Sequence, residues 1–396
     1  MTSTVDSTPS EGSALTKGSS DGVSAQEWQH LSALRQALAD CGAGPQHAAR
    51  FLRAWLWNQE LRAGRALPEN HFPRALLERS PGLRQGLSGL ARLVSDHPAE
   101  DGSRRLLLAL SDGRTVETVL LPRQGVCVST QIGCAVGCRF CMTGRDGLMR
   151  QLGSAEIVAQ VVLARSMAPV RKVVFMGMGE PAHNLAAVLE AIDLLGQEGQ
   201  IAHKQLVFST VGDERAFEAL ARQRIKPALA LSLHTTRHAL RRELLPRAPD
   251  LSPQYLVEAA HHYAELSAYP VQIQWTLLAG VNDGDDELEA IARMLHGRRM
   301  MLNLIPFNSV EGSGYERPSW ERAAEMARRL NRQGIYTRLR RSAGQDVEGG
   351  CGQLRARNPE VKTSTRSAHD RTVSEHQVML TPPRLRRAIN DGAGQP

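Results

Sequence analysis

Four of the six cysteines in the chain fall within residues 127–144. The last three of them, Cys134, Cys138 and Cys141, are spaced C-x3-C-x2-C, and a tight loop with this spacing lets three sulfur atoms converge. Thiolates are the natural ligands of a [4Fe–4S] cluster, which has four irons to ligate. The triplet therefore predicts a cluster that has one iron without a protein ligand.

An open iron of this kind can chelate a molecule that carries both an amine and a carboxylate, such as the methionine end of S-adenosylmethionine. One electron from the cluster can then cleave the sulfonium and give a 5′-deoxyadenosyl radical. Gly133 and Gly137 beside the cysteines permit the bends of the loop. The alternatives are a zinc site and unliganded thiols. Zinc requires a fourth nearby Cys or His, and no His occurs between Cys141 and His183, so the sequence favours a cluster.

Apolar strand-like segments alternate with helical patterns from about residue 150 to residue 340, which is typical of parallel strands joined by helices. With the strand expected at 126–130, just before the cysteine loop, this makes about six repeats. The sequence predicts an α/β fold with a partial (β/α)6 barrel rather than a closed eight-fold one. The later strands are expected at residues 172–176, 205–209, 228–233, 271–277, 301–305 and 336–339, and the helices at 154–165, 184–195, 214–222, 253–267, 285–296 and 318–333.

In such a fold the C-terminal ends of the strands and the loops after them carry the site. Polar and glycine-rich segments stand at several of these positions. They are Met176-Gly-Met-Gly-Glu180, Ser209-Thr210, Ser232-Leu-His234 and Pro306-Phe-Asn308.

The remaining segments predict four regions. Residues 1–26 lack apolar periodicity and are expected to be disordered. Residues 27–100 show helical spacing and predict a small accessory domain, whose basic residues either contact RNA or form a solvated helix surface. A hairpin at 104–109 and 115–121 opens the catalytic domain, residues 101–357. The polar residues 358–396 are expected to form a disordered tail.

The formal net charge of +7 suits a partner that carries phosphates, although solubility alone would also explain it. Aromatic residues make up only 4% of the chain, which argues against a simple RNA-binding module. The chain has no apolar run of membrane-spanning length and no secretory signal, so we expect a cytoplasmic protein with no membrane partner. Cysteines there are rarely paired in structural disulfides.

These motifs resemble those of the radical S-adenosylmethionine enzymes, in which the cysteine loop follows the first barrel strand and an aromatic residue, here Phe140, precedes the last ligand. Within them the chain is similar to the RNA adenine (C2/C8) methyltransferases of the RlmN/Cfr-like type, which modify 23S ribosomal RNA and in some cases tRNA. The resemblance runs from about Val116 to Leu354. It rests on Val116-Glu-Thr-Val119, Cys127-Val-Ser-Thr-Gln131, Met176-Gly-Met-Gly-Glu-Pro181, Ser232-Leu-His234, Val281-Asn-Asp283, Asn303-Leu-Ile-Pro306 and Cys351-Gly-Gln-Leu354.

The resemblance implies that Cys134, Cys138 and Cys141 bind the cluster. It also implies a set of contacts to S-adenosylmethionine, in which the Glu180 carboxylate receives the ammonium group. That set is Gly179, Glu180, Ser209, Ser232, Leu233, His234 and Asn308. Each Ser or Asn alone could equally cap a strand end, and His234 is expected to contribute mainly its backbone.

The resemblance further implies that Cys351 accepts a methyl group from one S-adenosylmethionine. A radical from a second one then activates this group for addition to adenine. Cys127 helps to remove the ring proton, and a transient Cys127–Cys351 disulfide releases the product. Glu117 matches a proposed acid or base of the family. The alternatives are a small buried thiol for each cysteine and a surface glutamate for Glu117.

Gly349-Gly350 before Cys351 departs from the family pattern, so the position of methylation, C2 or C8, stays open. The expected partners are rRNA or tRNA and an electron donor such as flavodoxin or ferredoxin, and we expect a monomer. Two other classes remain: a radical enzyme with a non-RNA substrate, and a non-enzymatic RNA-binding protein with a structural metal. The pair Cys127 and Cys351 favours RNA methylation, because other radical enzymes need no such pair.

Overall fold

The computed structural model describes residues 25–355. The termini for which the sequence predicts disorder lie outside this range, apart from Ala25 and Gln26, which begin a short 3₁₀ helix that ends at Trp28. Within the described residues, no helix combines the length and apolarity needed to cross a membrane.

Three helices follow the 3₁₀ turn: α1 (Leu31–Asp40), α2 (Pro45–Leu56) and α3 (Arg74–Ser88). Each buries one apolar stripe, as the spacing of the leucines predicts. The helical region is nevertheless shorter than the predicted 27–100, because Ala91–Pro98 forms strand β1 and pairs antiparallel with β2. Half of the residues of β1 are exposed, and the strand lacks an alternating apolar pattern, so the pairing with β2 rather than its own sequence makes it a strand.

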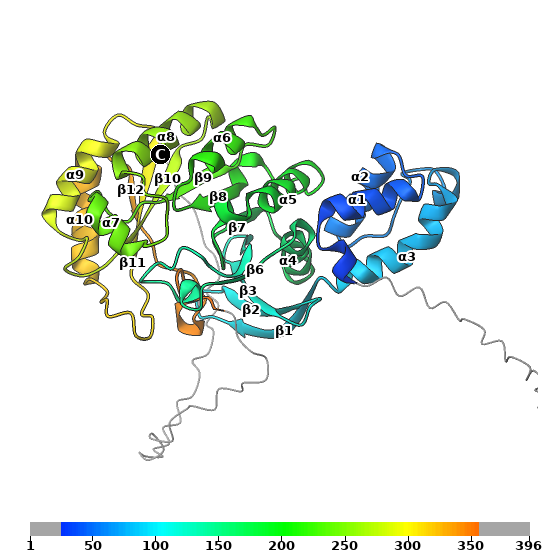
Figure 1. The fold of residues 1–396 in the computed structure, drawn as a ribbon, viewed down its shortest axis with the longest axis horizontal. Coiled ribbons are helices and arrows are strands. Elements are labelled where there is room, and N and C mark those ends of the chain that lie inside the picture. Colours follow the sequence, from blue (N-terminus) through cyan, green and yellow to red (C-terminus); the bar gives the residue numbers. More distant parts are fainter. Residues whose placement is uncertain (1–24, 356–396) are drawn as a thin grey trace, which may run out of the picture. The chain divides into compact units, whose positions relative to one another are not determined.

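The main sheet has ten strands in the order β1-β2-β3-β4-β7-β8-β9-β10-β11-β12 (Figure 1). Neighbouring strands are antiparallel up to β4 and parallel from β4 to β12. The bounds after β1 are β2 (Arg104–Leu110), β3 (Thr115–Leu121), β4 (Gly125–Cys127), β7 (Lys172–Phe175), β8 (Leu206–Thr210), β9 (Ala228–Ser232), β10 (Val271–Leu277), β11 (Met300–Pro306) and β12 (Thr337–Leu339).

Helices join the parallel strands in the predicted alternation. They are α4 (Ser154–Met167), α5 (Leu185–Gln197), α6 (Glu214–Arg222), α8 (Pro253–Ser267), α9 (Asp285–Leu295) and α10 (Trp320–Arg332). Since β1 and β12 end the strand order and do not pair with each other, the sheet stays open. The predicted partial (β/α)6 barrel and the hairpin β2–β3 are therefore confirmed.

The two faces of the parallel strands carry different side chains. One face packs with the helices in the large apolar core, which includes Val173 and Phe175 of β7. The other face forms a separate small apolar cluster, with Val174 of β7, Val207 of β8 and Ala230 of β9. Because side chains alternate along a strand, every second residue of β7 points into the barrel.

Besides β1, a hairpin and a short helix were not predicted. A hairpin of β5 (Gln131–Gly133) and β6 (Leu148–Gln151) brackets the cysteine loop, and the short helix α7 (His238–Leu244) lies between β9 and α8. Gly133 has φ +76°, and a Cβ there would stand 2.0 Å from the carbonyl oxygen of Gly147. Only glycine therefore fits where the chain enters the loop, as the sequence predicts.

Candidate active site

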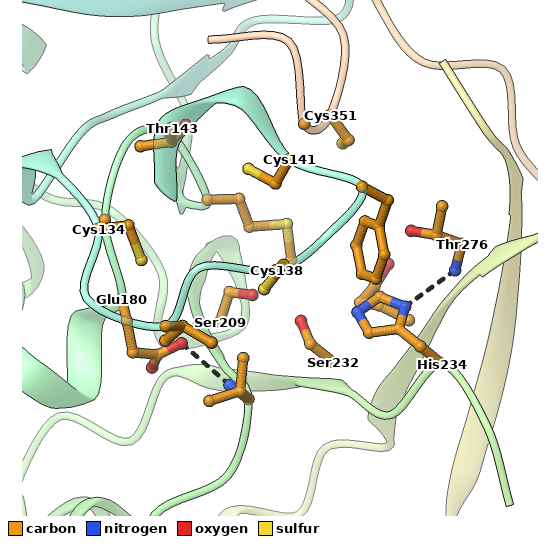
Figure 2. Close-up of a pocket in the computed structure, with 18 of the residues that line it drawn as sticks. Cys134, Cys138, Cys141, Thr143, Glu180, Ser209, Ser232, His234, Thr276 and Cys351 are labelled. Atoms are coloured by element: carbon orange, nitrogen blue, oxygen red, sulfur yellow. Dashed lines mark hydrogen bonds between the residues drawn. The ribbon is translucent and has the colours of Figure 1, made fainter. Parts of the chain in front are cut away.

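The cysteine loop lies over the C-terminal ends of the parallel strands, where a cavity opens. Cys134, Cys138 and Cys141 line this first cavity together with polar residues from three strand ends (Figure 2). The polar residues are Glu180 after β7, Ser209 on β8, and Ser232 and His234 at the end of β9. The structure thus gathers most of the predicted cluster and cofactor residues around one space.

The three loop thiols fit the ligand set of an iron–sulfur cluster. Burial raises the pKa of Cys134 to about 12, and burial with the neighbouring Cys141 and Cys134 raises the pKa of Cys138 well above its usual value. Such thiols must lose protons when they bind metal. Within residues 25–355 no three His, Cys, Asp or Glu side chains stand close enough to hold a single metal ion. A cluster spreads its ligands over separate irons, so these thiols can stand further apart.

Arg241 on α7 is a buried cation next to this site that the sequence analysis missed. It donates to the backbone carbonyl oxygen of Val211 and, at 3.5 Å, to that of Ser232, two residues that line the cavity. Its Nε has no hydrogen-bond partner although it is buried. Burial lowers the pKa of Arg241 to about 10, and the nearby Cys138 and Glu180 oppose this shift. One buried positive charge therefore faces the thiols and the carboxylate.

Glu180 is held in place by backbone N–H groups. Its Oε1 accepts from the Ala182 nitrogen at 3.1 Å. Its Oε2 accepts from the Val211 nitrogen at 3.0 Å, which is the dashed line from Glu180 in Figure 2. Burial raises the pKa of Glu180 to about 7. Gly179 has φ +103°, and a Cβ there would stand 2.6 Å from the side chain of Gln131. The glycine therefore lets this strand end pack against β5 and aims the carboxylate into the cavity.

His234 is fixed by its ring, in addition to its backbone. The ring Nδ1 accepts from the Thr276 nitrogen at 3.0 Å (Figure 2). The ring also stands edge to face against Phe140 of the cysteine loop, with the ring centroids 4.8 Å apart. Burial and then the charge of Arg241 lower the pKa of His234 to about 3. The imidazole is therefore neutral and supports the loop. Leu233 is buried outside the cavity lining, and its backbone nitrogen donates to Gln274.

Cys351 lines the first cavity and also a second one. The second cavity is lined by Cys127 on β4, Val174 and Met176 from β7, and the glycines around Cys351. Although the residue is exposed, protein atoms surround its thiol. Burial therefore raises the pKa of Cys351, while a hydrogen bond from Ser342 opposes the rise. Burial, then the nearby Cys351, raises the pKa of Cys127 to about 12. Of the predicted catalytic pair, only Cys351 reaches both spaces.

Asn308 holds the Cys351 segment in this structure. Its Nδ2 donates to the Cys351 carbonyl oxygen at 2.9 Å and to the Ser342 hydroxyl at 2.8 Å. Its Oδ1 accepts from Arg317 at 3.0 Å and from Gln345 at 2.8 Å. Asn308 is not among the residues that line either cavity. Contact with a cofactor stays a prediction and would require some of these bonds to change.

Glu117 is buried beneath the same segment and lines neither cavity. It forms an ion pair with Arg105, and its Oε2 accepts from the Arg355 nitrogen at 2.8 Å. Arg105 also donates to the Val347 carbonyl oxygen. In Figure 1 the segment after β12 (orange) lies between β11 and β2, and the bonds from Asn308 and Arg105 join it to both sides. The alternative of a surface glutamate is wrong, and the pair ties down the chain that bears Cys351.

All six cysteines lie within the described residues and are free thiols. The transient disulfide between Cys127 and Cys351 therefore stays a prediction. Cys41, which matches no motif, is buried in the N-terminal helices.

Comparisons with known proteins agree with this geometry. A family model described as the radical SAM superfamily, where SAM is S-adenosylmethionine, matches residues 128–295. A probable RNA methyltransferase of Thiobacillus denitrificans is 65% identical over 83% of this chain and 90% of its own length. One of Pseudomonas aeruginosa is 61% identical over 82% and 94%.

A solved structure supports the same family. The crystal structure of a radical SAM methyltransferase from Sphaerobacter thermophilus superposes with a TM-score of 0.70 at 32% identity, over 82% of this chain and 97% of that one. The identities of 65% and 61% to the two probable RNA methyltransferases extend over nearly the whole length of each relative, and they show a common family. The chain therefore belongs to the radical SAM methyltransferases, in the family that contains the probable RNA methyltransferases.

Proposed function

We propose that this enzyme methylates carbon 2 or carbon 8 of an adenosine in RNA and that Cys351 carries the methyl group as S-methylcysteine. The observation that supports this most is the position of Cys351, which lines the cavity of the three loop cysteines and the cavity of Cys127. A residue in this place can take up a group in one space and deliver it in the other. The names of the relatives supply the class of substrate.

The cofactors follow from the family and from the residues of the first cavity. Cys134, Cys138 and Cys141 would hold a [4Fe–4S] cluster, and Glu180, with Ser209 and Ser232, would bind S-adenosylmethionine. When bound, the cluster supplies the electron that cleaves S-adenosylmethionine. A one-electron carrier such as flavodoxin or ferredoxin would have to deliver that electron.

The two cysteines provide a route for a methylation that direct transfer from S-adenosylmethionine to the adenine carbon would perform poorly. Carbons 2 and 8 of adenine are electrophilic, so direct attack on a methyl sulfonium is a poor route. Cys351 would accept the methyl group instead: its S–C bond would form as the methyl–sulfonium bond of one S-adenosylmethionine breaks, and its thiol proton would leave. The radical from a second S-adenosylmethionine would take one hydrogen atom from this methyl group. The methyl carbon would then bond to the ring, which would give one electron back to the cluster and its proton to Cys127. Cys127 then attacks the sulfur of Cys351. The S–S bond forms as the S–C bond to the product breaks, and the released carbon takes a proton.

The RNA must present its base to a recessed thiol. An adenine inside a duplex cannot enter the cavity that Cys127 and Cys351 share, so the target has to be unpaired or flipped out of its stack. The structure of the RNA around the adenosine should therefore contribute to specificity.

Nucleoside mass spectrometry tests the proposal. A methyladenosine with the methyl group on carbon should disappear from rRNA or tRNA when the gene is deleted. The wild-type gene should restore it, whereas a Cys138→Ala variant should not. An unchanged nucleoside profile, together with normal cleavage of S-adenosylmethionine by the purified enzyme, would favour the alternative of a radical enzyme with another substrate.

A further inference from the structure

Four cations come from three places in the barrel: Lys172 from β7, Arg123 from the β3–β4 turn, and Arg338 and Arg340 from β12 and the residue after it. Lys172 is the first residue of β7 and points to the same side as Val174 and Met176, which line that cavity. Its backbone nitrogen donates to the Gln124 carbonyl oxygen at 3.1 Å, so it stands beside the turn that carries Arg123.

Arg338 and Arg340 approach the same place from the last strand. Arg338 on β12 is the register partner of Asn303 on β11, and the Arg340 Nε donates to the Asn303 side-chain oxygen at 2.9 Å. From Arg340 the chain continues into the segment that bears Cys351. The charge of Arg340 acts on that thiol and lowers its pKa against the effect of burial.

These four residues, Arg123, Lys172, Arg338 and Arg340, are called the basic patch below. Burial and the nearby charges of Arg340 and Arg338 lower the pKa of Lys172. Burial, then Arg338 and more weakly Arg123, lowers the pKa of Arg340. The members therefore lie close enough to repel one another.

In the part of the chain that the structure describes, carboxylates do not relieve this repulsion. Within residues 25–355, no ion pair joins any member of the basic patch to an Asp or Glu. Elsewhere, by contrast, clustered arginines are neutralised: Arg322 and Arg329 on α10 both bind Asp285 at 2.8 Å. A group of unpaired like charges beside a cavity leaves room for an anionic ligand.

An exposed aromatic side chain flanks the basic patch. Tyr336 is 52% exposed and lies under the guanidinium of Arg338, 5.2 Å from the ring centroid. Arginine and aromatic planes are the surfaces on which unpaired bases stack in proteins that bind single-stranded nucleic acid.

We propose that the basic patch binds the phosphodiester backbone of the RNA next to the target adenosine, and that Tyr336 stacks one of the flanking bases. This inference rests on the proposed function, and it names the route by which an unpaired strand reaches Cys351. The strand would lie along the open side of the barrel, between β12 and the β3–β4 turn. Contacts of this kind give affinity and position without reading the sequence.

Binding measured as a function of salt tests the inference. The probe is a single-stranded 12-nucleotide RNA with one adenosine and a 5′-fluorescein, followed by anisotropy at several NaCl concentrations. On a single strand, each cation that contacts a phosphate adds about 0.7 to the slope of log K against log salt. The variants Lys172→Gln and Arg338→Gln should each lower the slope by about 0.7, and the double variant by about 1.4. Arg222→Gln on α6 is the matched control and should leave it unchanged.

Tyr336→Ala separates stacking from charge. It should weaken binding about tenfold at every salt concentration and leave the slope as in the wild type. Polyglutamate of the same charge is a second probe. If it competes as well as RNA does, the site is a general polyanion site, and the RNA assignment is overturned. Slopes equal to that of the wild type in the double variant, with thermal unfolding unchanged, also overturn it.

The failure of this inference can be told from that of the proposed function. Cleavage of S-adenosylmethionine without RNA should be the same in the double variant and in the wild type. If the wild-type enzyme methylates RNA but the double variant keeps the wild-type slope, only the RNA-binding role of the basic patch is wrong. If the wild-type enzyme neither methylates nor binds RNA, both this role and the proposed function are wrong.

Discussion

Cys127 and Cys351 line one cavity, although Cys127 belongs to the first parallel strand and Cys351 follows the last one. The open barrel makes this possible, because the segment after β12 lies beside β2 and β11. Cys351 also reaches the cavity of Cys134, Cys138 and Cys141. The two thiols therefore differ in their access: Cys351 lines both cavities, whereas Cys127 lines only the second.

Replacement of Cys127 by Ala should stop the reaction after the methyl carbon has bonded to the base. Without the resolving thiol, the S–C bond between Cys351 and the RNA cannot break. A covalent protein–RNA adduct should accumulate on denaturing gels and disappear after ribonuclease treatment. The double variant Cys127→Ala, Cys351→Ala is the control and should form no adduct. Normal turnover by the single variant would contradict a resolving role for Cys127.

Loss of either partner of the ion pair between Arg105 and Glu117 should destabilise the protein. Both side chains are buried, so Arg105→Met or Glu117→Gln leaves a charge without its partner, at a cost of about 3–5 kcal/mol. Urea unfolding measures this effect. Glu218→Gln, which breaks the exposed pair of Glu218 with Arg222, is the control and should leave stability unchanged. If Glu117→Gln keeps full stability but loses turnover, the role of Glu117 is that of an acid or base.

Arg241→Gln should make the cluster harder to reduce. Removal of a buried positive charge beside Cys138 and Glu180 disfavours the state that carries one more electron. An EPR-monitored redox titration of the reconstituted protein should give a more negative midpoint potential than in the wild type. Arg242→Gln changes an exposed neighbour and should leave the potential unchanged. Equal potentials for Arg241→Gln and the wild type would show that its charge does not act on the cluster.

His234 should make stability depend on pH. Its pKa is about 3 in the fold and about 6.5 in the unfolded chain, so the unfolded chain binds more protons between these values. The contribution of His234 is complete above pH ~6.5. It is lost as the pH falls, by up to ~1.4 kcal/mol per unit. Urea unfolding from pH 7 to pH 5 should show a smaller decline for His234→Gln than for the wild type or the exposed control His262→Gln. The same decline in all three proteins would contradict the assignment.

The sequence predicted much of the barrel because its signals are local. Apolar runs such as those of β7 and β10 alternate with long helical patterns, and their boundaries agree to within a residue or two. The strand predicted at 126–130 is shorter, since β4 ends at Cys127. Strand β1 was missed because its pairing with β2, rather than its own residues, determines it. Helix α7 was missed because it is short and two arginines, Arg241 and Arg242, interrupt its apolar pattern.

The residues of the candidate site were likewise predicted only in part. The spacing of Cys134, Cys138 and Cys141 and the strand-end motifs predicted residues that do line one cavity. The arrangement of Asn308, Glu117 and Arg105 around the Cys351 segment could not be predicted, because each contact joins residues far apart in sequence. For Arg241 the only signal was its place a few residues after Ser232-Leu-His234, and nothing there shows that it folds back toward Cys138.

The central claim is that Cys351 carries the methyl group, and peptide mass spectrometry tests it most directly. Protein purified without oxygen from cells grown with deuterated methyl methionine should contain a labelled methyl group on the sulfur of Cys351. The Cys351→Ala variant should contain none. A labelled methyl group on Cys127 or any other residue, or an unmodified Cys351 in an enzyme that methylates RNA, would contradict the account.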